Sequence, residues 1–187
     1  MKGTIFVLFL LMGLNATAQD ISVRFDRNSD IDFTRYSTYY WARQVVSERD
    51  EPHYFLNDLV LKADVRDAVR SELDDKGYQF TDVSPDLLIN FRLFDKATKL
   101  SGFEGYGFEY WDRSEFNLAA AVKEHYVDAG TLIISIIDRR EQALVWQGFA
   151  SGLLQDGELT KDEGKIRDAV KLIFDEYGLT ANKYTRR

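Results

Sequence analysis

Two neighbouring segments near the C-terminus constrain the fold of this chain most. Residues 131–137 are apolar at nearly every position, which is typical of a strand buried at the centre of a sheet. A polar turn follows at 138–142, and residues 143–149 then return with a second strand signal. These two segments predict a β-hairpin in the middle of a sheet.

Three other segments also indicate strands. Residues 21–25 alternate apolar and polar side chains, and the second half of 32–41 is dense in strand formers. Pro85 opens a third strand, in which Leu87, Ile89, Phe91 and Leu93 share one face. We therefore expect a sheet of several strands.

The segment between these strands and the hairpin has a less clear pattern. Residues 98–115 combine three glycines with aromatic residues, which indicates a loop or the tip of a long hairpin. Residues 116–127 alternate at the start but also contain a stretch with helix propensity at 119–124. We predict a strand for 116–127, with a helix as the alternative.

Apolar side chains recur at helical spacing in two further segments. The first has a cap at Asn57 or Asp58 and ends at Gly77; the second ends at Gly178. A capping box from Thr160 to Glu163 is expected to open the second helix. The apolar positions are Leu61, Val65, Ala68, Val69 and Leu73 in the first helix, and Ile166, Ala169, Val170, Ile173, Phe174 and Tyr177 in the second.

Runs of strands interrupted by two helices predict an α+β fold. We expect a mainly antiparallel sheet with the two amphipathic helices packed on one face, in a single domain over residues 19–187. The other face would be partly open, and Tyr39, Trp41 and Phe94 are candidates to line it.

The first 18 residues have the pattern of a secretory signal peptide. Lys2 precedes an apolar run at 5–14, and small residues lead to Ala18, which predicts cleavage before Gln19. A transmembrane helix would need about 20 apolar residues. We therefore expect residues 1–18 to be removed and the mature protein to reach the periplasm, the cell envelope or the medium, with no membrane-spanning segment.

Composition excludes several classes of protein. The chain has no cysteine, so it can carry neither a disulfide, nor a thiolate nucleophile, nor the lipid of a lipoprotein. Lys2 is the only charged residue before position 19, so the mature chain would have 23 basic and 31 acidic residues and a net charge of −8. Such a balance argues against a nucleic-acid-binding protein. The high hydrophobic content (45%) predicts a packed core.

Four parts of the chain form a recognisable combination: 32–41, Val65–Val69 with Gly77–Tyr78, Pro85–Ile89, and Gly130–Leu132 with Val145–Gly148. Together they resemble the family catalogued as domain of unknown function 4136, found in exported proteins and lipoproteins of Gram-negative bacteria. The resemblance implies an envelope protein and brings no established activity. Members often have a lipid-attachment cysteine, which this chain lacks, and many have aspartate where this chain has Ser135.

Candidate catalytic and metal-binding residues do not form a recognised constellation. Ser151 lies between Gly148 and Gly152, but the spacing is not that of a nucleophile elbow, and a strand-end turn explains it better. His53 and His125 are far apart in the sequence. The acids at 156, 158, 162 and 163 do not have the spacing of a calcium loop, so we predict no metal and no cofactor.

Aromatic residues are the candidates for binding. Tyr106, Tyr110 and Trp111 lie in the glycine-rich segment, and Tyr39 and Trp41 lie in the second strand; all five can instead be core residues. The leading hypothesis is a non-enzymatic binding or structural module for a partner protein, a glycan or a lipid, which predicts an exposed apolar or aromatic patch. The alternative is a hydrolase of envelope material, which predicts a pocket where two carboxylates, or Ser151 and a base, have shifted pKa values.

Overall fold

The computed structural model describes residues 21–27, 31–42, 58–103, 122–178 and 180–181. Six strands form the main sheet, in the order β1-β8-β7-β4-β2-β3, and two further pairs are β5-β6 and β9-β10. The elements are β1 (Ser22–Arg27), η1 (Phe33–Arg35), β2 (Thr38–Trp41), α1 (Leu59–Asp75), β3 (Gln79–Phe80), β4 (Leu87–Phe94), β5 (Thr98–Phe103), β6 (Val122–Val127), β7 (Thr131–Asp138), β8 (Ala143–Ser151), β9 (Leu154–Gln155), β10 (Glu158–Leu159) and α2 (Glu163–Tyr177).

The main sheet is mixed and mostly antiparallel, and with two helices the fold is α+β. The strands β1, β8, β7 and β4 are antiparallel neighbours, whereas β2 pairs in parallel with both β4 and β3. Parallel neighbours need a long crossover connection, and α1 lies in the crossover between β2 and β4. All eight residues of β7 are buried, which confirms the prediction of a central strand and its hairpin with β8.

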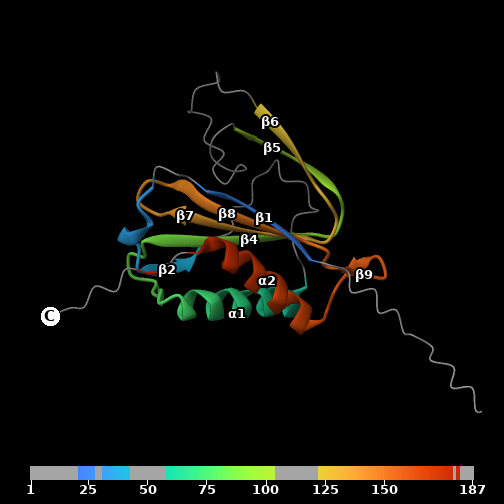
Figure 1. The fold of residues 1–187 in the computed structure, drawn as a ribbon, viewed down its shortest axis with the longest axis horizontal. Coiled ribbons are helices and arrows are strands. Elements are labelled where there is room, and N and C mark those ends of the chain that lie inside the picture. The colour runs from blue at the N-terminus through green and yellow to red at the C-terminus, as the bar shows by residue number, and fades with distance from the viewer. Residues whose placement is uncertain (1–20, 28–30, 43–57, 104–121, 179, 182–187) are drawn as a thin grey trace, which may run out of the picture.

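The largest apolar cluster joins the sheet to both helices. Figure 1 shows α1 and α2 beneath the six-stranded sheet and the β5-β6 pair above it. In β4 the residues at 87, 89, 91 and 93 are buried in this cluster, as their alternation predicts. The expected apolar positions of both helices are also buried in it.

Gly148 sets the closest approach between β8 and α2. A Cβ atom at this position would lie 2.3 Å from Cη2 of Trp146 and 2.6 Å from Cγ2 of Ile173. No side chain fits at such distances without displacing its neighbours. The absence of a side chain at Gly148 therefore allows Trp146 to pack edge-to-face on Tyr177, with ring centroids 5.1 Å apart.

The helix ends confirm one prediction and correct another. Asp58 caps α1 through hydrogen bonds from the backbone N–H groups of Val60 and Leu61, as expected. The prediction of a capping box at the start of α2 is wrong. Asp162 is the N-cap and accepts from the N–H groups of residues 164 and 165, whereas Thr160 Oγ1 accepts from the N–H of Asp162. An aspartate adds its negative charge to the cap, which favours it over threonine at a helix N-terminus.

The β5-β6 pair settles part of the ambiguous region. Residues 122–127 form a strand, as predicted, and this strand pairs antiparallel with residues 98–103. Residues 98–103, which were expected in a loop or at the tip of a hairpin, are therefore a strand. Residues 104–121 lie outside the described part of the chain, as do residues 1–18, for which a signal peptide is expected. Neither helix of the described structure is long and apolar enough to span a membrane.

Candidate functional site

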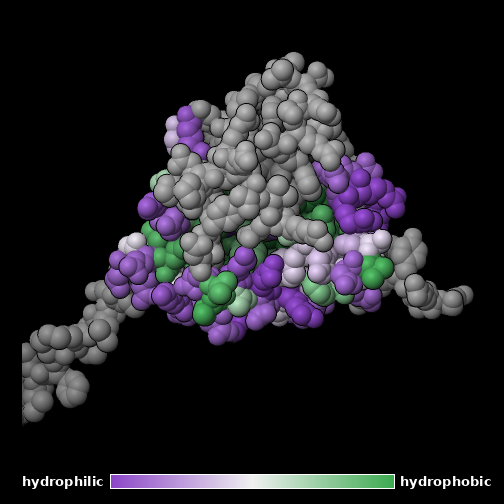
Figure 2. All heavy atoms as spheres, turned by 180° about the vertical axis from the view of Figure 1, so that it is seen from behind, coloured by the Kyte–Doolittle hydropathy of each residue, from purple (hydrophilic) through white to green (hydrophobic). Residues whose placement is uncertain are grey.

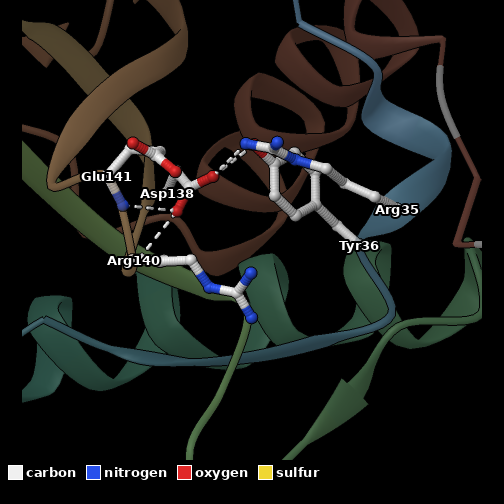
Figure 3. Close-up of polar contacts among 5 residues, drawn as sticks. All are labelled: Arg35, Tyr36, Asp138, Arg140 and Glu141. Carbon is white, nitrogen blue, oxygen red and sulfur yellow. Dashed lines mark hydrogen bonds and ion pairs between the residues drawn. The ribbon is translucent and has the colours of Figure 1, made fainter.

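A polar pocket of about 390 Å³ lies at the end of the sheet where β7 finishes and β4 begins. Three arginines and two aspartates line it. Figure 3 shows how Arg35 and Tyr36, from the segment around η1, meet Asp138 at the end of β7. The lining residues are Arg35, Tyr36, Ser84, Pro85, Asp86, Asp138, Arg139 and Arg140.

Asp138 is the central acceptor of this site and is almost fully buried. Its Oδ2 accepts a hydrogen bond of 2.8 Å from the Tyr36 hydroxyl and forms an ion pair with Nη2 of Arg35. Its Oδ1 accepts from the backbone N–H groups of Arg140 at 2.7 Å and Glu141 at 2.9 Å (Figure 3). An ionised carboxylate accepts about four hydrogen bonds, so Asp138 is saturated by the protein itself.

These contacts fix the protonation states. Burial favours the neutral form of Asp138, but the hydrogen bonds from Glu141, Tyr36 and Arg140 outweigh it and hold the pKa of this carboxyl below its usual range. Burial raises the pKa of Tyr36, and its hydrogen bond to Asp138 raises it further. At neutral pH the site therefore contains an ionised carboxylate and a neutral phenol.

Asp86 clamps the start of β2 to the start of β4. Its Oδ2 accepts from the backbone N–H of Ser37 at 2.9 Å and of Thr38 at 3.0 Å, and also from both hydroxyl groups. Burial raises the pKa of Asp86, but these four hydrogen bonds lower it more, so the net shift is downward. None of the hydrogen bonds within the described structure reaches Oδ1.

The three arginines of the pocket differ in their partners. Arg35 is held by Asp138 and Tyr36, with its guanidinium 4.9 Å from the Tyr36 ring centroid. The Nε of Arg139 donates to the Pro85 carbonyl at 2.6 Å. Arg140 has an exposed side chain and no ion pair to the described residues, and in Figure 3 its guanidinium points away from Asp138. Guanidinium groups suit the planar oxygens of carboxylates and phosphates.

The described aromatic residues that were proposed for binding from the sequence, Tyr39 and Trp41, do not line this pocket. Tyr39 is fully buried, and its hydroxyl is 3.2 Å from Oδ1 of Asp74 in α1. Trp41 is half-buried beneath the guanidinium of Arg66, also in α1, at 5.0 Å. Both therefore lie on the side of the sheet that faces α1, not on the opposite face where we expected them.

The remaining aromatic candidates are only partly placed. Phe94 does lie on the face opposite α1, where it is buried with Val127, Ile133 and Phe149. Tyr106, Tyr110 and Trp111 fall outside the described residues. A binding role for the five aromatic candidates stays a prediction.

The catalytic and metal candidates have structural partners. Ser151 ends β8, with its hydroxyl 2.9 Å from that of Thr131. Asp162 caps α2, and Glu163 forms an exposed ion pair with Arg167. Within the described ranges no three acidic or histidine side chains come together as metal ligands. His53 lies outside these ranges.

The arginine pocket was not predicted from the sequence. The chain offered one signal, because a carboxylate stands at the end of one buried strand, at 138, and immediately before another, at 86. Polar residues at strand ends often form sites on a rigid scaffold. Recognising this one required knowing that β4 and β7 are neighbours.

The fold and the pocket define a class of protein: an α+β domain with a mixed six-stranded sheet, two helices and a polar site at one sheet end. The chain belongs to the family Domain of unknown function (DUF4136), whose model matches residues 22–177. The resemblance drawn from the sequence is thus confirmed.

One of the similar solved structures supports the same fold. A DUF4136 family protein from Bacteroides thetaiotaomicron is 18% identical, with a TM-score of 0.58, and the match covers 87% of this chain and 98% of that one. A PDZ domain protein from Parabacteroides distasonis is 20% identical with a TM-score of 0.49, over 89% of this chain and 37% of that one. A PelC dodecamer from Paraburkholderia phytofirmans is 9% identical with a TM-score of 0.41, over 88% of this chain and 100% of that one. No curated protein matches the chain.

Proposed function

We propose that this protein is a non-enzymatic binding module of the bacterial cell envelope, whose ligand carries negative charge and docks in the arginine pocket. One observation carries the proposal. Asp138 is saturated by internal hydrogen bonds, whereas Arg140 offers its guanidinium donors to solvent. The pocket therefore presents cationic donors without an intramolecular acceptor, which is the arrangement an anionic ligand completes.

The setting of the pocket strengthens the electrostatic argument. The whole chain has a net charge of −7, so long-range attraction does not bring anions to it. An anion that binds must find a local excess of positive charge. The pocket has such an excess, since it contains three arginines and two aspartates.

A hydrolase is the second candidate, because the pocket brings together two carboxylates with shifted pKa values. Both shifts are downward. A general acid at neutral pH needs a raised pKa, and Asp138 has no acceptor site left for a nucleophilic or basic role. The geometry therefore favours binding over hydrolysis.

An apolar docking surface has less support than the pocket. In Figure 2, which views the molecule from behind, hydrophobic residues of the coloured part form separate patches among hydrophilic ones. The large exposed apolar residues come from different segments of the chain. They are Phe25, Leu59, Val60, Phe80, Val83, Tyr126 and Leu172.

The location of the protein is part of the proposal. The signal peptide expected at residues 1–18 directs export, so the ligand would be met in the periplasm or the cell envelope, as an acidic glycan, a lipid headgroup or a partner protein. We further propose that α1 and α2 pack together on one face of the sheet, which leaves the sheet end with the pocket accessible.

The test compares Arg140→Gln with Arg167→Gln, a matched charge removal on the exposed side of α2. Binding of citrate, inorganic phosphate and polygalacturonate is measured by isothermal titration calorimetry at low salt. We expect at least one anion to bind the wild type, with about tenfold weaker binding in Arg140→Gln alone. Equal weakening in both variants, or none in either, contradicts the proposal. Hydrolysis of envelope glycans that stops in Asp138→Asn, with the variant folded, supports the hydrolase.

A further inference from the structure

We infer that the pocket binds an acidic sugar, that is, a sugar ring with one carboxylate, such as a hexuronate. This inference rests on the proposed function and narrows its ligand class. It combines three properties of the pocket: its size, its net charge, and an acceptor that a simple anion cannot satisfy.

The size of the pocket argues for more than a bare ion. Its volume of about 390 Å³ falls in the lower part of the range for small-molecule sites, roughly 300–1,000 Å³. Charged residues dominate the lining, so an apolar ligand would remove water from these groups without replacing the lost hydrogen bonds. A polar ligand of the size of a monosaccharide suits this space.

The charge balance argues for a single negative charge. Arg35 is neutralised by Asp138, and the pocket as a whole has three cations against two carboxylates, an excess of one. A carboxylate supplies that one charge, whereas a phosphate monoester brings up to two. The guanidinium of Arg140, which has no ion pair within the described structure, can form two parallel hydrogen bonds with a carboxylate.

Asp86 argues for a ligand that also donates hydrogen bonds. Its pKa is lowered, so it is ionised at neutral pH and can only accept. Its Oδ2 is occupied by Ser37 and Thr38, but no described group donates to Oδ1. An anion without hydroxyl groups would meet only repulsion at Asp86. A ring hydroxyl can donate to it, so a uronate satisfies Arg140 and Asp86 together.

Ser84 adds a second polar group for the sugar ring. It lines the pocket, its side chain is exposed, and its backbone has φ of 47°. A residue other than glycine in this left-handed region is strained by about 1–3 kcal/mol and persists only where its surroundings hold it. The backbone that carries the Ser84 hydroxyl is therefore held in place at the pocket wall.

The experiment measures binding of glucuronate, glucose and acetate to the full protein by calorimetry and saturation-transfer NMR. Glucose lacks the charge and acetate lacks the hydroxyl groups. We expect glucuronate to bind about tenfold more tightly than either. Arg140→Gln should reduce glucuronate binding to the level of glucose. In Ser84→Gly, the glycine adopts the positive φ readily. This substitution should weaken the binding of glucuronate but leave the binding of acetate unchanged.

The outcomes separate this inference from the proposed function. If acetate and glucuronate bind equally well and both depend on Arg140, the pocket binds anions but the acidic-sugar inference is wrong. If no anion binds, or if binding does not depend on Arg140, both the acidic-sugar inference and the proposed function are wrong. A trigalacturonate that binds more tightly than galacturonate identifies a glycan as the source of the uronate, and the reverse order identifies a free sugar acid; either order supports the inference.

Discussion

Replacing Asp138 by asparagine tests whether the hydrogen-bonded carboxylate holds this end of the sheet together. The substitution keeps the shape of the side chain but removes its charge and turns one oxygen into an NH2 group. That NH2 group must face either the N–H groups of Arg140 and Glu141 or the donors of Tyr36 and Arg35. Two donors lose their acceptor in either orientation.

The expected loss follows from these contacts. A hydrogen bond to a charged group contributes about 1.5–3 kcal/mol, and a buried donor without an acceptor costs about 1–3 kcal/mol. The Arg35 side chain is 48% exposed, so its ion pair adds little beyond this. We therefore expect Asp138→Asn to lower the free energy of unfolding by about 3 kcal/mol, out of a typical total of 5–15 kcal/mol.

Urea denaturation followed by circular dichroism at several pH values measures this loss. The pKa of Asp138 is lowered in the folded state, so its ionised form stabilises the fold above the unfolded pKa of about 3.9. That stabilisation disappears as the pH falls through the lowered folded pKa. The gap between wild type and variant should be widest near pH 7 and narrow below about pH 4.

Asp156→Asn is the matched control, because Asp156 is exposed and its φ of 53° is one that asparagine adopts readily. Its stability should stay within about 0.5 kcal/mol of wild type. The reasoning is refuted if Asp138→Asn costs less than about 1 kcal/mol at pH 7, the net value of a single ordinary hydrogen bond. A gap that persists unchanged in acid refutes it as well, because it would not come from the ionised carboxylate.

Two further substitutions test the packing and the helix start. Gly148→Ala should destabilise the protein by about 3 kcal/mol in urea denaturation, because the new methyl group overlaps Trp146; Gly157→Ala, with open space around it but φ of 85°, should cost only about 1 kcal/mol. Asp162→Ala should cost about 1 kcal/mol through loss of the cap of α2. Glu163→Ala, which removes an exposed ion pair, should lower the stability less than Asp162→Ala does. A larger loss in Glu163→Ala would instead support the capping box between Thr160 and Glu163.

The sequence allowed the buried faces to be predicted well, because the spacing of apolar residues records which side of an element meets the core. In β4, Leu87 and Ile89 alternate with partly exposed neighbours, and in α1 Val65 and Val69 recur at helical spacing. Both patterns are local. They need no knowledge of which strands are neighbours, and they were confirmed for that reason.

The strand order was not predictable in the same way. The segment with Tyr39 and Trp41 was recognised as a strand, but its parallel pairing with β3 and β4 depends on a crossover that includes the whole of α1. A strand of four residues has too little pattern to show which face is buried. This is why Tyr39 was expected on the open face and lies against α1 instead.

The site was missed for a related reason. Tyr36 and Asp138, which share a hydrogen bond, are 102 residues apart. Tyr36 lies in a segment of the family resemblance, but neither residue belongs to a motif of known function, and each alone resembles an ordinary strand-end residue. Only the antiparallel pairing of β4 with β7 and the parallel pairing of β2 with β4 bring Arg35, Asp86 and Asp138 to one end of the sheet.

The side chain of Arg140 is separate from the hydrogen bonds that stabilise the pocket. Asp86 and Asp138 join β2, β4 and β7, so a change at either one alters the fold as well as the site. Arg140 contributes its backbone N–H to Asp138, but its side chain has no ion pair within the described structure. Replacing the Arg140 side chain therefore leaves the hydrogen bonds of Asp138 in place and removes one cation from the pocket. Because of this separation, a loss of binding in Arg140→Gln, with unchanged stability, reports on recognition of the ligand and not on unfolding.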